Sequence, residues 1–404
     1  MSNNDLPLSG IKLVEFTHMV MGPTAGLILA DMGASAIKVE PLKGDNTRRL
    51  KGSGAGYFPM YNRNKRSICL DLKSVRGKEA AFRLIKDADV LIENFRPGAM
   101  EKLGFAYDDM SKLNPGLIYC SLKGFLSGPY EKRTALDEVT QMMGGLAYMT
   151  GLPGRPLRAG SSVIDITGGM FGVIAILAAL EQRHRTGKGQ QVTSSLFETT
   201  AFLVGQHLAQ EGVTGTAPPP MSVRTSAWSI YEIFKSADNQ QVFVGVVSDS
   251  LWKLFCHEFE LTELANDRSL DTNNQRVDQK ERVLPVVREM FANMDKAEMI
   301  RRLEKAGVPF APVNRPSDLL DDPHMNASGA LVEVTLSGGE GAGQKIKIPA
   351  IPVEMNQRKF DVRRDLPTEG RDSLEVLEEL GYSPDELQLM LEEGVIRRSR
   401  RQWN

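Results

Sequence analysis

Residues 11–40 have the sequence IKLVEFTHMVMGPTAGLILADMGASAIKVE, which contains the pattern of a strand, a helix and a second strand. Residues 11–16 and 36–39 are apolar runs of the length and composition that strands favour. Residues 23–32 predict a helix between them, because Pro23 suits the first helical position and Gly33 suits the position just after the last one. The stretch therefore predicts a β-α-β unit.

The same alternation continues through the first half of the chain. Residues 77–88 have apolar residues at helical spacing, and residues 89–92 and 117–122 are strand-like runs. Strands that alternate with helices indicate an α/β fold with a mostly parallel sheet covered on both faces. We therefore expect a large, doubly wound, Rossmann-like domain, in which ligands bind at the carboxyl ends of the strands.

A second domain is expected, because 404 residues are too many for one ordinary core. Residues 211–225 contain three successive prolines and predict a linker. Residues 226–322 combine a β-rich stretch with charged amphipathic helices and predict a smaller α/β domain. We expect residues 1–210 and about 330–404 to form the large domain together.

The composition argues against several kinds of protein. Hydrophobic residues make up 41% and charged residues 25% of the chain, and the net charge of −2 gives no basic surface for nucleic acid. The longest apolar stretch, residues 168–180, is shorter than the roughly 20 residues of a membrane span. Cys69, Cys120 and Cys256 form no CxxC motif and suit a reducing compartment. We expect a cytoplasmic protein without a metal site.

The segment SSVIDITGG, residues 161–169, places an acid among small residues, before a helix that residues 170–184 predict. A carboxylate at the start of a helix is stabilised by the free N–H groups and the helix dipole, by about 0.3–1 kcal/mol. Asp165 is therefore either a helix cap or a reactive carboxylate, beside which Gly168 and Gly169 would let a bulky substrate approach. The local sequence alone favours the cap.

Several motifs, in their order and spacing, resemble those of the class III CoA-transferases, the family that contains formyl-CoA transferase and is related to α-methylacyl-CoA racemase. The resemblance covers nearly the whole chain and rests on LSGIKLVEF at 8–16, LADMGA at 29–34, IKVE at 37–40, NRNKRSI at 62–68, ENFRPG at 93–98, TGKGQ at 186–190, GVPFAPVN at 307–314 and GYS at 381–383. It implies an acyl-CoA donor, a carboxylic acid acceptor and an interlaced homodimer whose two chains pass through one another like links.

The resemblance also implies roles for particular residues. Asp165 stands where the family keeps its catalytic aspartate, and Asp137 matches an acidic position beside the active site. Asp165 would form a mixed anhydride with the acyl group and then a thioester with CoA, while backbone N–H groups near Gly168 and Gly169 stabilise the oxyanions. The CoA-binding positions of the family correspond to His18, Met19, Leu70, Lys73, Asn94, Phe95, Arg96, Lys102 and Arg133.

Three departures from the family pattern limit the activity that the resemblance implies. Val20 stands where formyl-CoA transferases carry a glutamine, and residues 226–231 lack their glycine run. Both departures argue against oxalate–formate exchange. Leu136 stands where the racemase has a histidine, which argues against proton exchange at an α-carbon, since a second acid–base group is missing.

We expect the acceptor to be a C4–C5 dicarboxylic acid such as succinate, malate, mesaconate, citramalate or itaconate, with transfer between two acids or between the two carboxyls of one. Arg48, Arg49 and Arg224 are candidates to hold the second carboxylate, but the sequence favours an ordinary surface charge for each of them. A 2-methylacyl-CoA racemase is the first alternative, and an inactive CoA-binding protein is the second.

Overall fold

The structure is a computed structural model that describes residues 5–224, 226–339, 341–397 and 399. The chain divides into two compact units, Met1–Ser222 with Pro323–Asn404, and Val223–Asp322. Residues at both ends of the predicted large domain, and residue 225 of the predicted linker, lie outside the described residues. The linker was predicted to begin at residue 211, but helix α10 (Gly205–Thr214) continues to Thr214 and ends at Gly215, whose φ of 68° is left-handed.

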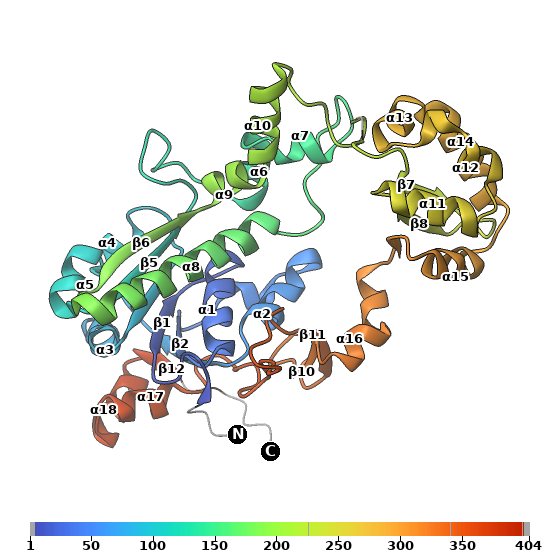
Figure 1. Cartoon of the computed structure of the whole chain (residues 1–404). Helices are drawn as coiled ribbons and strands as arrows, with labels where there is room; N and C mark the ends of the chain where they lie inside the picture. Colours follow the sequence, from blue (N-terminus) through green and yellow to red (C-terminus); the bar gives the residue numbers. More distant parts are fainter. Residues whose placement is uncertain (1–4, 225, 340, 398, 400–404) are drawn as a thin grey trace. The chain divides into compact units, whose positions relative to one another are not determined.

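The larger unit is built on a seven-stranded sheet of order β12-β3-β2-β1-β4-β5-β6 (Figure 1). Neighbouring strands are parallel except for β12, which runs antiparallel to β3. The strands are β1 (Lys12–Phe16), β2 (Ser35–Glu40), β3 (Lys65–Leu70), β4 (Val90–Glu93), β5 (Ile118–Lys123), β6 (Gln190–Ser195) and β12 (Ile396–Arg397). The predicted α/β fold with a large, mostly parallel sheet is confirmed, and the strand order reverses between β1 and β4.

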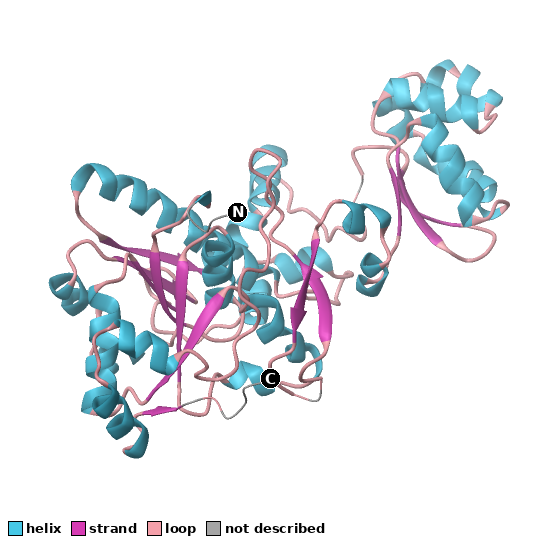
Figure 2. Ribbon diagram, turned by 90° about the horizontal axis from the view of Figure 1, so that it is seen from below, coloured by secondary structure: helices cyan, strands magenta, loops and turns pink. Residues whose placement is uncertain are grey.

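Helices cover both faces of this sheet, because successive side chains of each strand point to opposite faces (Figure 2). In β1, Leu13 packs into the core beneath α1 (Met21–Asp31) and α8 (Val163–Thr186), whereas Val14 packs into the core on the other face. That second core is covered by α3 (Val75–Lys86), α4 (Ala99–Leu103), α5 (Tyr107–Leu113), α17 (Ser373–Glu379) and α18 (Pro384–Glu392).

The C-terminal part of the chain completes the larger unit. Asp372 accepts a hydrogen bond from the backbone N–H of Ser67 in β3 at 2.8 Å, and Arg66 forms an ion pair with Glu379 at 2.7 Å. Helix α18 begins at the predicted cap, with Ser383 and Glu386 bonding each other's backbone N–H groups. The remaining elements of this unit are α2 (Tyr57–Tyr61), α6 (Asp137–Met143), α7 (Leu146–Thr150), α9 (Leu196–Leu203), α16 (Pro323–Ala327), β10 (Leu331–Thr335) and β11 (Lys345–Pro349).

The smaller unit has a core of its own around Phe234, Trp252, Phe255 and Phe291. Its antiparallel sheet has the order β7-β8-β9. Its elements are β7 (Tyr231–Lys235), β8 (Gln241–Gly245), β9 (Phe310–Pro312), α11 (Asp249–Glu258), α12 (Thr262–Asn266), α13 (Asn273–Asp278), α14 (Lys280–Ala292) and α15 (Lys296–Ala306).

Helix α8 is longer than the sequence predicted. It spans 24 residues, from Val163 to Thr186, and Gly187 caps its end. The apolar stretch at residues 168–180 therefore covers only part of the helix. By length and composition α8 is able to cross a membrane, yet it packs along α1, β5 and β6 of the larger unit (Figure 1). This packing explains its apolar character, because one side of α8 contributes to the core beneath α1.

Candidate active site

A cavity of ≈ 320 Å³ opens at the carboxyl ends of β1 and β4, where the strand order reverses. Open α/β sheets bind their ligands at this position. Eight of the residues that the sequence pointed to line this one cavity: His18, Met19, Asn94, Phe95, Arg96, Arg133, Asp137 and Asp165.

The loop after β1 is held in place by two side chains from elsewhere in the chain. Asn94 accepts a hydrogen bond from the His18 N–H at 3.0 Å and donates one to the His18 carbonyl at 2.9 Å. Met19 has a left-handed backbone with φ 62°, and its N–H donates to Thr47 Oγ1 at 2.9 Å. Left-handed backbone is unfavourable for a residue such as methionine, so these contacts compensate for strain in the loop. Asn94 therefore positions the loop that lines the cavity.

His18 and Phe95 form an aromatic pair just beyond the carboxyl ends of β1 and β4. Their ring centroids are 5.7 Å apart and their planes differ by 25°. Burial lowers the pKa of His18 below its usual value of 6.5, although the nearby charge of Asp45 acts in the opposite direction. The imidazole is therefore neutral at pH 7 and presents a flat, uncharged surface beside Phe95.

A second cavity of ≈ 510 Å³ lies next to the first, and Phe95 lines both. Its wall brings together Leu70 and Lys73, which the resemblance assigned to CoA binding. Lys102 is exposed on α4 and immediately precedes Leu103, which lines this second cavity. The CoA-binding positions thus divide into two neighbouring groups that meet at Phe95.

Asp165 is the third residue of α8, so it is not the N-cap that the local sequence favoured. The cap position is Ser162, whose side chain makes no capping bond. Asp137, from α6, accepts the N–H groups of Ile164 at 2.8 Å and Asp165 at 3.1 Å with its Oδ2 atom. A carboxylate in this position satisfies the free amides of the first turn. Asp137 therefore takes the capping role, and Asp165 lines the cavity without capping the helix.

The Asp165 carboxyl has an unusual protonation equilibrium. Burial, together with the negative charge of Asp137, raises its pKa to about 7, and Arg158 partly opposes this rise. Comparable proton-bound and free populations therefore coexist at neutral pH. A carboxylate that is poorly solvated is a stronger nucleophile than one in water, because less solvent must be displaced when it attacks.

Asp137 is itself held by contacts that the sequence did not suggest. Gln141, four residues further on α6, donates its Nε2–H to Asp137 Oδ1 at 2.5 Å. Arg158 lies 4.0 Å from the same oxygen and forms an ion pair with Glu138. The four-residue spacing of Asp137 and Gln141 on one helix could have indicated their contact. No local pattern could have indicated the approach of Arg158 to Asp137.

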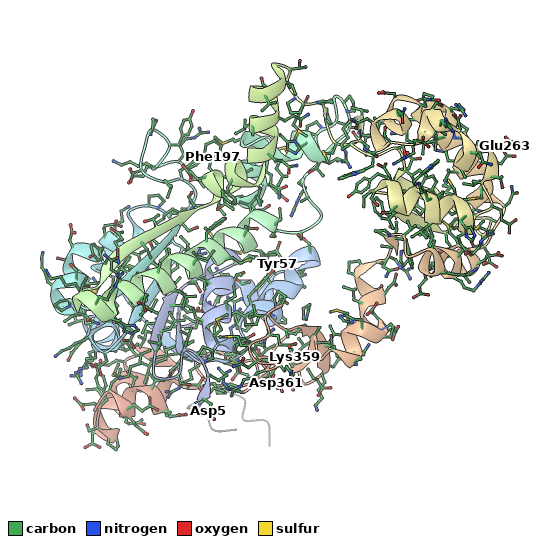
Figure 3. The ribbon with its side chains drawn as sticks, viewed as in Figure 1. Asp5, Tyr57, Phe197, Glu263, Lys359 and Asp361 are labelled. Atoms are coloured by element: carbon green, nitrogen blue, oxygen red, sulfur yellow. The ribbon has the colours of Figure 1, made fainter. Side chains whose placement is uncertain are left out.

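Two tyrosines of α2 lie near the first turn of α8. Figure 3 labels Tyr57 on α2. The Tyr57 hydroxyl is 3.4 Å from Ser162 Oγ, and Tyr57 lines the cavity of Asp165. Burial, together with the charge of Asp165, raises the pKa of Tyr61 to about 12. Sequence reasoning missed both tyrosines, because α2 and α8 are far apart in the chain.

Gly168 and Gly169 pack against α1. A Cβ atom on Gly169 would lie 2.7 Å from the carbonyl oxygen of Met21, and one on Gly168 would lie 2.7 Å from Met21 Cε. Both are buried in the second turn of α8. Their small size therefore lets α8 approach α1 closely.

Of the three arginines that the sequence suggested for a second carboxylate, two make other contacts and the third belongs to the smaller unit. Arg48 forms an ion pair with Glu40 at 2.6 Å and donates to the carbonyl of Pro367 at 2.8 Å. Arg49 donates to the carbonyl of Lys43 at 2.7 Å, and Arg224 belongs to the smaller unit. The cations that do line the cavity of Asp165 are Arg96, Lys123, Arg133 and Arg158.

Comparison with known proteins identifies similar chains along nearly the whole length. The family described as CoA-transferase family III matches residues 8–373. A succinate–glutarate CoA-transferase from Agrobacterium fabrum is 33% identical, over 94% of this chain and 97% of the relative. An acetyl-CoA:oxalate CoA-transferase from Acetobacter aceti is 34% identical, over 87% of this chain and 89% of the relative. The crystal structure of a CaiB/BaiF family protein from Brucella suis superimposes with a TM-score of 0.81 at 31% identity, over 93% of this chain and 99% of that one.

Proposed function

The chain belongs to CoA-transferase family III, and on this premise we propose that it moves coenzyme A from an acyl-CoA donor to a short dicarboxylic acid through covalent catalysis by Asp165. The observation that carries the proposal is the state of Asp165. Its carboxyl lines a cavity at the reversal point of the sheet, and burial with the charge of Asp137 raises its pKa to about 7. A half-ionised, poorly solvated carboxylate suits nucleophilic attack on a thioester.

Asp165 performs the chemistry in four steps. Its carboxylate oxygen attacks the thioester carbonyl, and the carbon–sulfur bond breaks to give an aspartyl mixed anhydride and the CoA thiolate. The aspartyl carbonyl then accepts this thiolate, which releases the donor acid as a carboxylate and leaves Asp165 as a thioester of CoA. The acceptor carboxylate attacks that thioester, and the thiolate is released again. The thiolate finally attacks the acyl carbon of the new anhydride, which gives the product acyl-CoA and restores the Asp165 carboxylate.

The two cavities suit the two ends of CoA. Leu70 and Phe95 offer an apolar border for the adenine, and Lys73 lies in the same wall as a partner for a phosphate. Arg96 and Arg133 line the first cavity, where the chain of CoA would lead to Asp165. The loop of His18 and Met19 would then border the thioester end.

The acceptor is proposed to carry two carboxylates. The relative from Agrobacterium fabrum is named for two dicarboxylic acids, succinate and glutarate. Of the cations that line the cavity of Asp165, Lys123 is paired with Glu93 at 2.6 Å and Arg158 is paired with Glu138. Arg96 and Arg133 are therefore the cations proposed to attract a second carboxylate. Transfer within one diacid would use the same groups.

The racemase alternative gains no support from this cavity. Leu136 lines it immediately before Asp137, and a leucine cannot exchange a proton. The inactive CoA-binding protein is less well supported than the transferase, because Asp165 and Asp137 are both present with their carboxyls in the same cavity.

We propose that the protein acts as an interlaced homodimer. Helices α6, α8, α9 and α10 of the larger unit carry exposed apolar side chains: Met142, Ile174, Phe202, Leu208 and Val213. Apolar surface of this extent is unusual on a monomer and is typical of a subunit interface. Light scattering with size-exclusion chromatography would test this, and we expect a dimer that Phe202→Glu weakens, because Phe202 is 71% exposed in the single chain. A monomeric unmutated protein would contradict the proposal.

The covalent mechanism is tested by intact-protein mass spectrometry after mixing with succinyl-CoA. We expect a CoA adduct on the unmutated protein that disappears when an acceptor acid is added, and no adduct on Asp165→Ala. Asp108→Asn is the matched control, since Asp108 is an exposed aspartate in the first turn of α5. Acceptor specificity is tested with succinate, glutarate, malate, mesaconate, citramalate, itaconate and oxalate beside butyrate. Absence of an adduct with several acyl-CoA donors would remove the central step.

A further inference from the structure

The side chain of Gln141 is fully buried on α6, next to the candidate nucleophile but without a place in the cavity wall. Both ends of its amide are bonded. Nε2–H donates to Asp137 Oδ1 at 2.5 Å, and Oε1 accepts the N–H of Ala159 at 2.8 Å. A buried amide with both ends satisfied has one orientation, because reversing it would place like groups against each other.

Gln141 thereby joins three parts of the chain around Asp165. Asp137 belongs to the first turn of α6, and its other oxygen accepts the first amides of α8. Ala159 belongs to the segment that leads into α8 at Val163. A displacement of the Gln141 amide would therefore move both the cap of α8 and the segment before it, and Asp165 lies where these two meet.

Among the described residues, Gln141 is the one side chain that donates a hydrogen bond to the Asp137 carboxylate. Arg158 is 4.0 Å from Asp137 Oδ1 and is bound instead by Glu138 and by the carbonyls of Ala159 and Ser161, the last two at 3.0 Å each. If the Gln141 amide were lost, Asp137 Oδ1 would be free to turn toward Arg158, whose cation is the nearest alternative partner.

We propose that Gln141 is a positioning residue, which holds the Asp137 carboxylate against the first turn of α8 and so sets the orientation and ionisation of Asp165. The inference rests on the proposed function, in which Asp165 is the nucleophile. It extends that function to a residue that touches neither substrate nor the reacting atoms.

The charges around Asp165 determine in which direction its pKa should change when Gln141 is replaced. The acids Asp137 and Glu138 belong to α6, and Arg158 belongs to the segment before α8. The other charged or titratable groups near Asp165 are Tyr57 and Tyr61 of α2, His18 after β1, Arg96 after β4, Lys123 of β5 and Arg133 before α6. Of these, the Asp137 charge raises the pKa of Asp165 and the Arg158 charge lowers it.

Two variants of Gln141 are therefore expected to differ in their effect on the pKa of Asp165. In Gln141→Met the shape is kept and the donor is lost, so Asp137 turns toward Arg158 and the pKa of Asp165 falls below about 7. In Gln141→Glu the new carboxyl lies against the Asp137 carboxylate, and one of the two keeps a proton because carboxylates in such close contact do not both ionise. That proton restores a donor to Asp137, so the pKa of Asp165 stays close to its value in the unmutated protein. The limb of kcat/KM that reports ionisation of the free enzyme should therefore move to lower pH in Gln141→Met and stay in place in Gln141→Glu.

The experiment measures the pH profile of kcat/KM and the rate of CoA-adduct formation for the unmutated protein, Gln141→Met and Gln141→Glu. We expect kcat to fall about tenfold to a hundredfold in Gln141→Met, the factor that corresponds to loss of a hydrogen bond to a charged group. Asn114→Leu is the matched control, because Asn114 is another amide bonded at both ends, to the carbonyls of Ile85 at 3.1 Å and Ala88 at 2.7 Å and to the N–H of Gly116 at 3.1 Å, and it does not line the cavity. The control should lower thermal stability without moving the pH limb.

A second measurement does not depend on activity. Each protein and its version with the additional Asp165→Asn change are melted at several pH values from pH 5 to pH 9. The difference between their two thermal midpoints changes with pH where Asp165 titrates, and so it reports the pKa of Asp165. The inference would be overturned if the pH limb and the midpoint difference of Gln141→Met coincided with those of the unmutated protein. A lack of CoA adduct on the unmutated protein would instead overturn the proposed function, and the midpoint series would still decide whether Gln141 controls Asp165.

Discussion

Replacing Asp165 by asparagine should make the protein more stable at high pH, even though it removes the proposed nucleophile. The folded protein keeps a proton on Asp165 up to a pH of about 7, whereas the unfolded chain loses it above the ordinary pKa of 3.8. Stability therefore falls as the pH rises from about 4 to about 7, and it is constant above that. The whole difference between the two pKa values, at 1.36 kcal/mol for each pKa unit, corresponds to about 4 kcal/mol.

The part of this loss that falls between pH 5 and pH 8 is about 3 kcal/mol, because about two pKa units separate pH 5 from a pKa of about 7. Calorimetric melting of the unmutated protein and Asp165→Asn at both pH values measures it. We expect the midpoint advantage of Asp165→Asn to be several degrees larger at pH 8 than at pH 5. Asp108→Asn, which removes an exposed aspartate, should show no such change between the two pH values. An equal advantage of Asp165→Asn at both pH values would refute the assignment of a raised pKa.

Three further outcomes follow from the site. Asp137→Asn should move the acid limb of kcat/KM to lower pH, because the charge that helps to raise the pKa of Asp165 is removed; an unmoved limb would contradict this. Gly169→Ala should lower the free energy of unfolding by about 1–3 kcal/mol, since its Cβ would lie 2.7 Å from the Met21 carbonyl oxygen, and chemical denaturation measures the loss. Lys73→Ala should weaken CoA binding in calorimetric titration and reduce its dependence on salt, whereas equal affinity at all salt concentrations would exclude Lys73 as a phosphate partner.

The order of strands and helices could be predicted from the chain alone, because each depends on neighbours within one or two turns. The pattern of residues 11–40 suffices for β1, α1 and β2, and Gly187 marks the end of α8 through its left-handed backbone. The strand ends after β1 and β4 also carry their own signals, so His18 and Asn94 could be placed at the binding edge of a parallel sheet before any contact was known.

The start of α8 could not be predicted in this way. Ser161 to Gly169 contains small residues that favour a loop, and the helix nevertheless begins at Val163 because Asp137 satisfies its first amides. That carboxylate comes from α6, 28 residues before Asp165, and no local pattern reveals such a contact. Asp165 was identified as a candidate from its neighbours in the sequence. That it does not cap the helix depends on Asp137, which accepts the first amides of α8 in its place.

The raised pKa of Asp165, the brace made by Gln141 and the packing of Gly169 on α1 all arise from atoms that approach one another across long stretches of chain. Burial and electrostatic interaction depend on distance in space and on the exclusion of water, and neither is encoded by spacing along the sequence. Local signals thus predicted which elements form and at which edge of the sheet the cavity lies, while the folded arrangement alone showed that Asp137 caps α8 and that Asp165 lines the cavity without capping the helix.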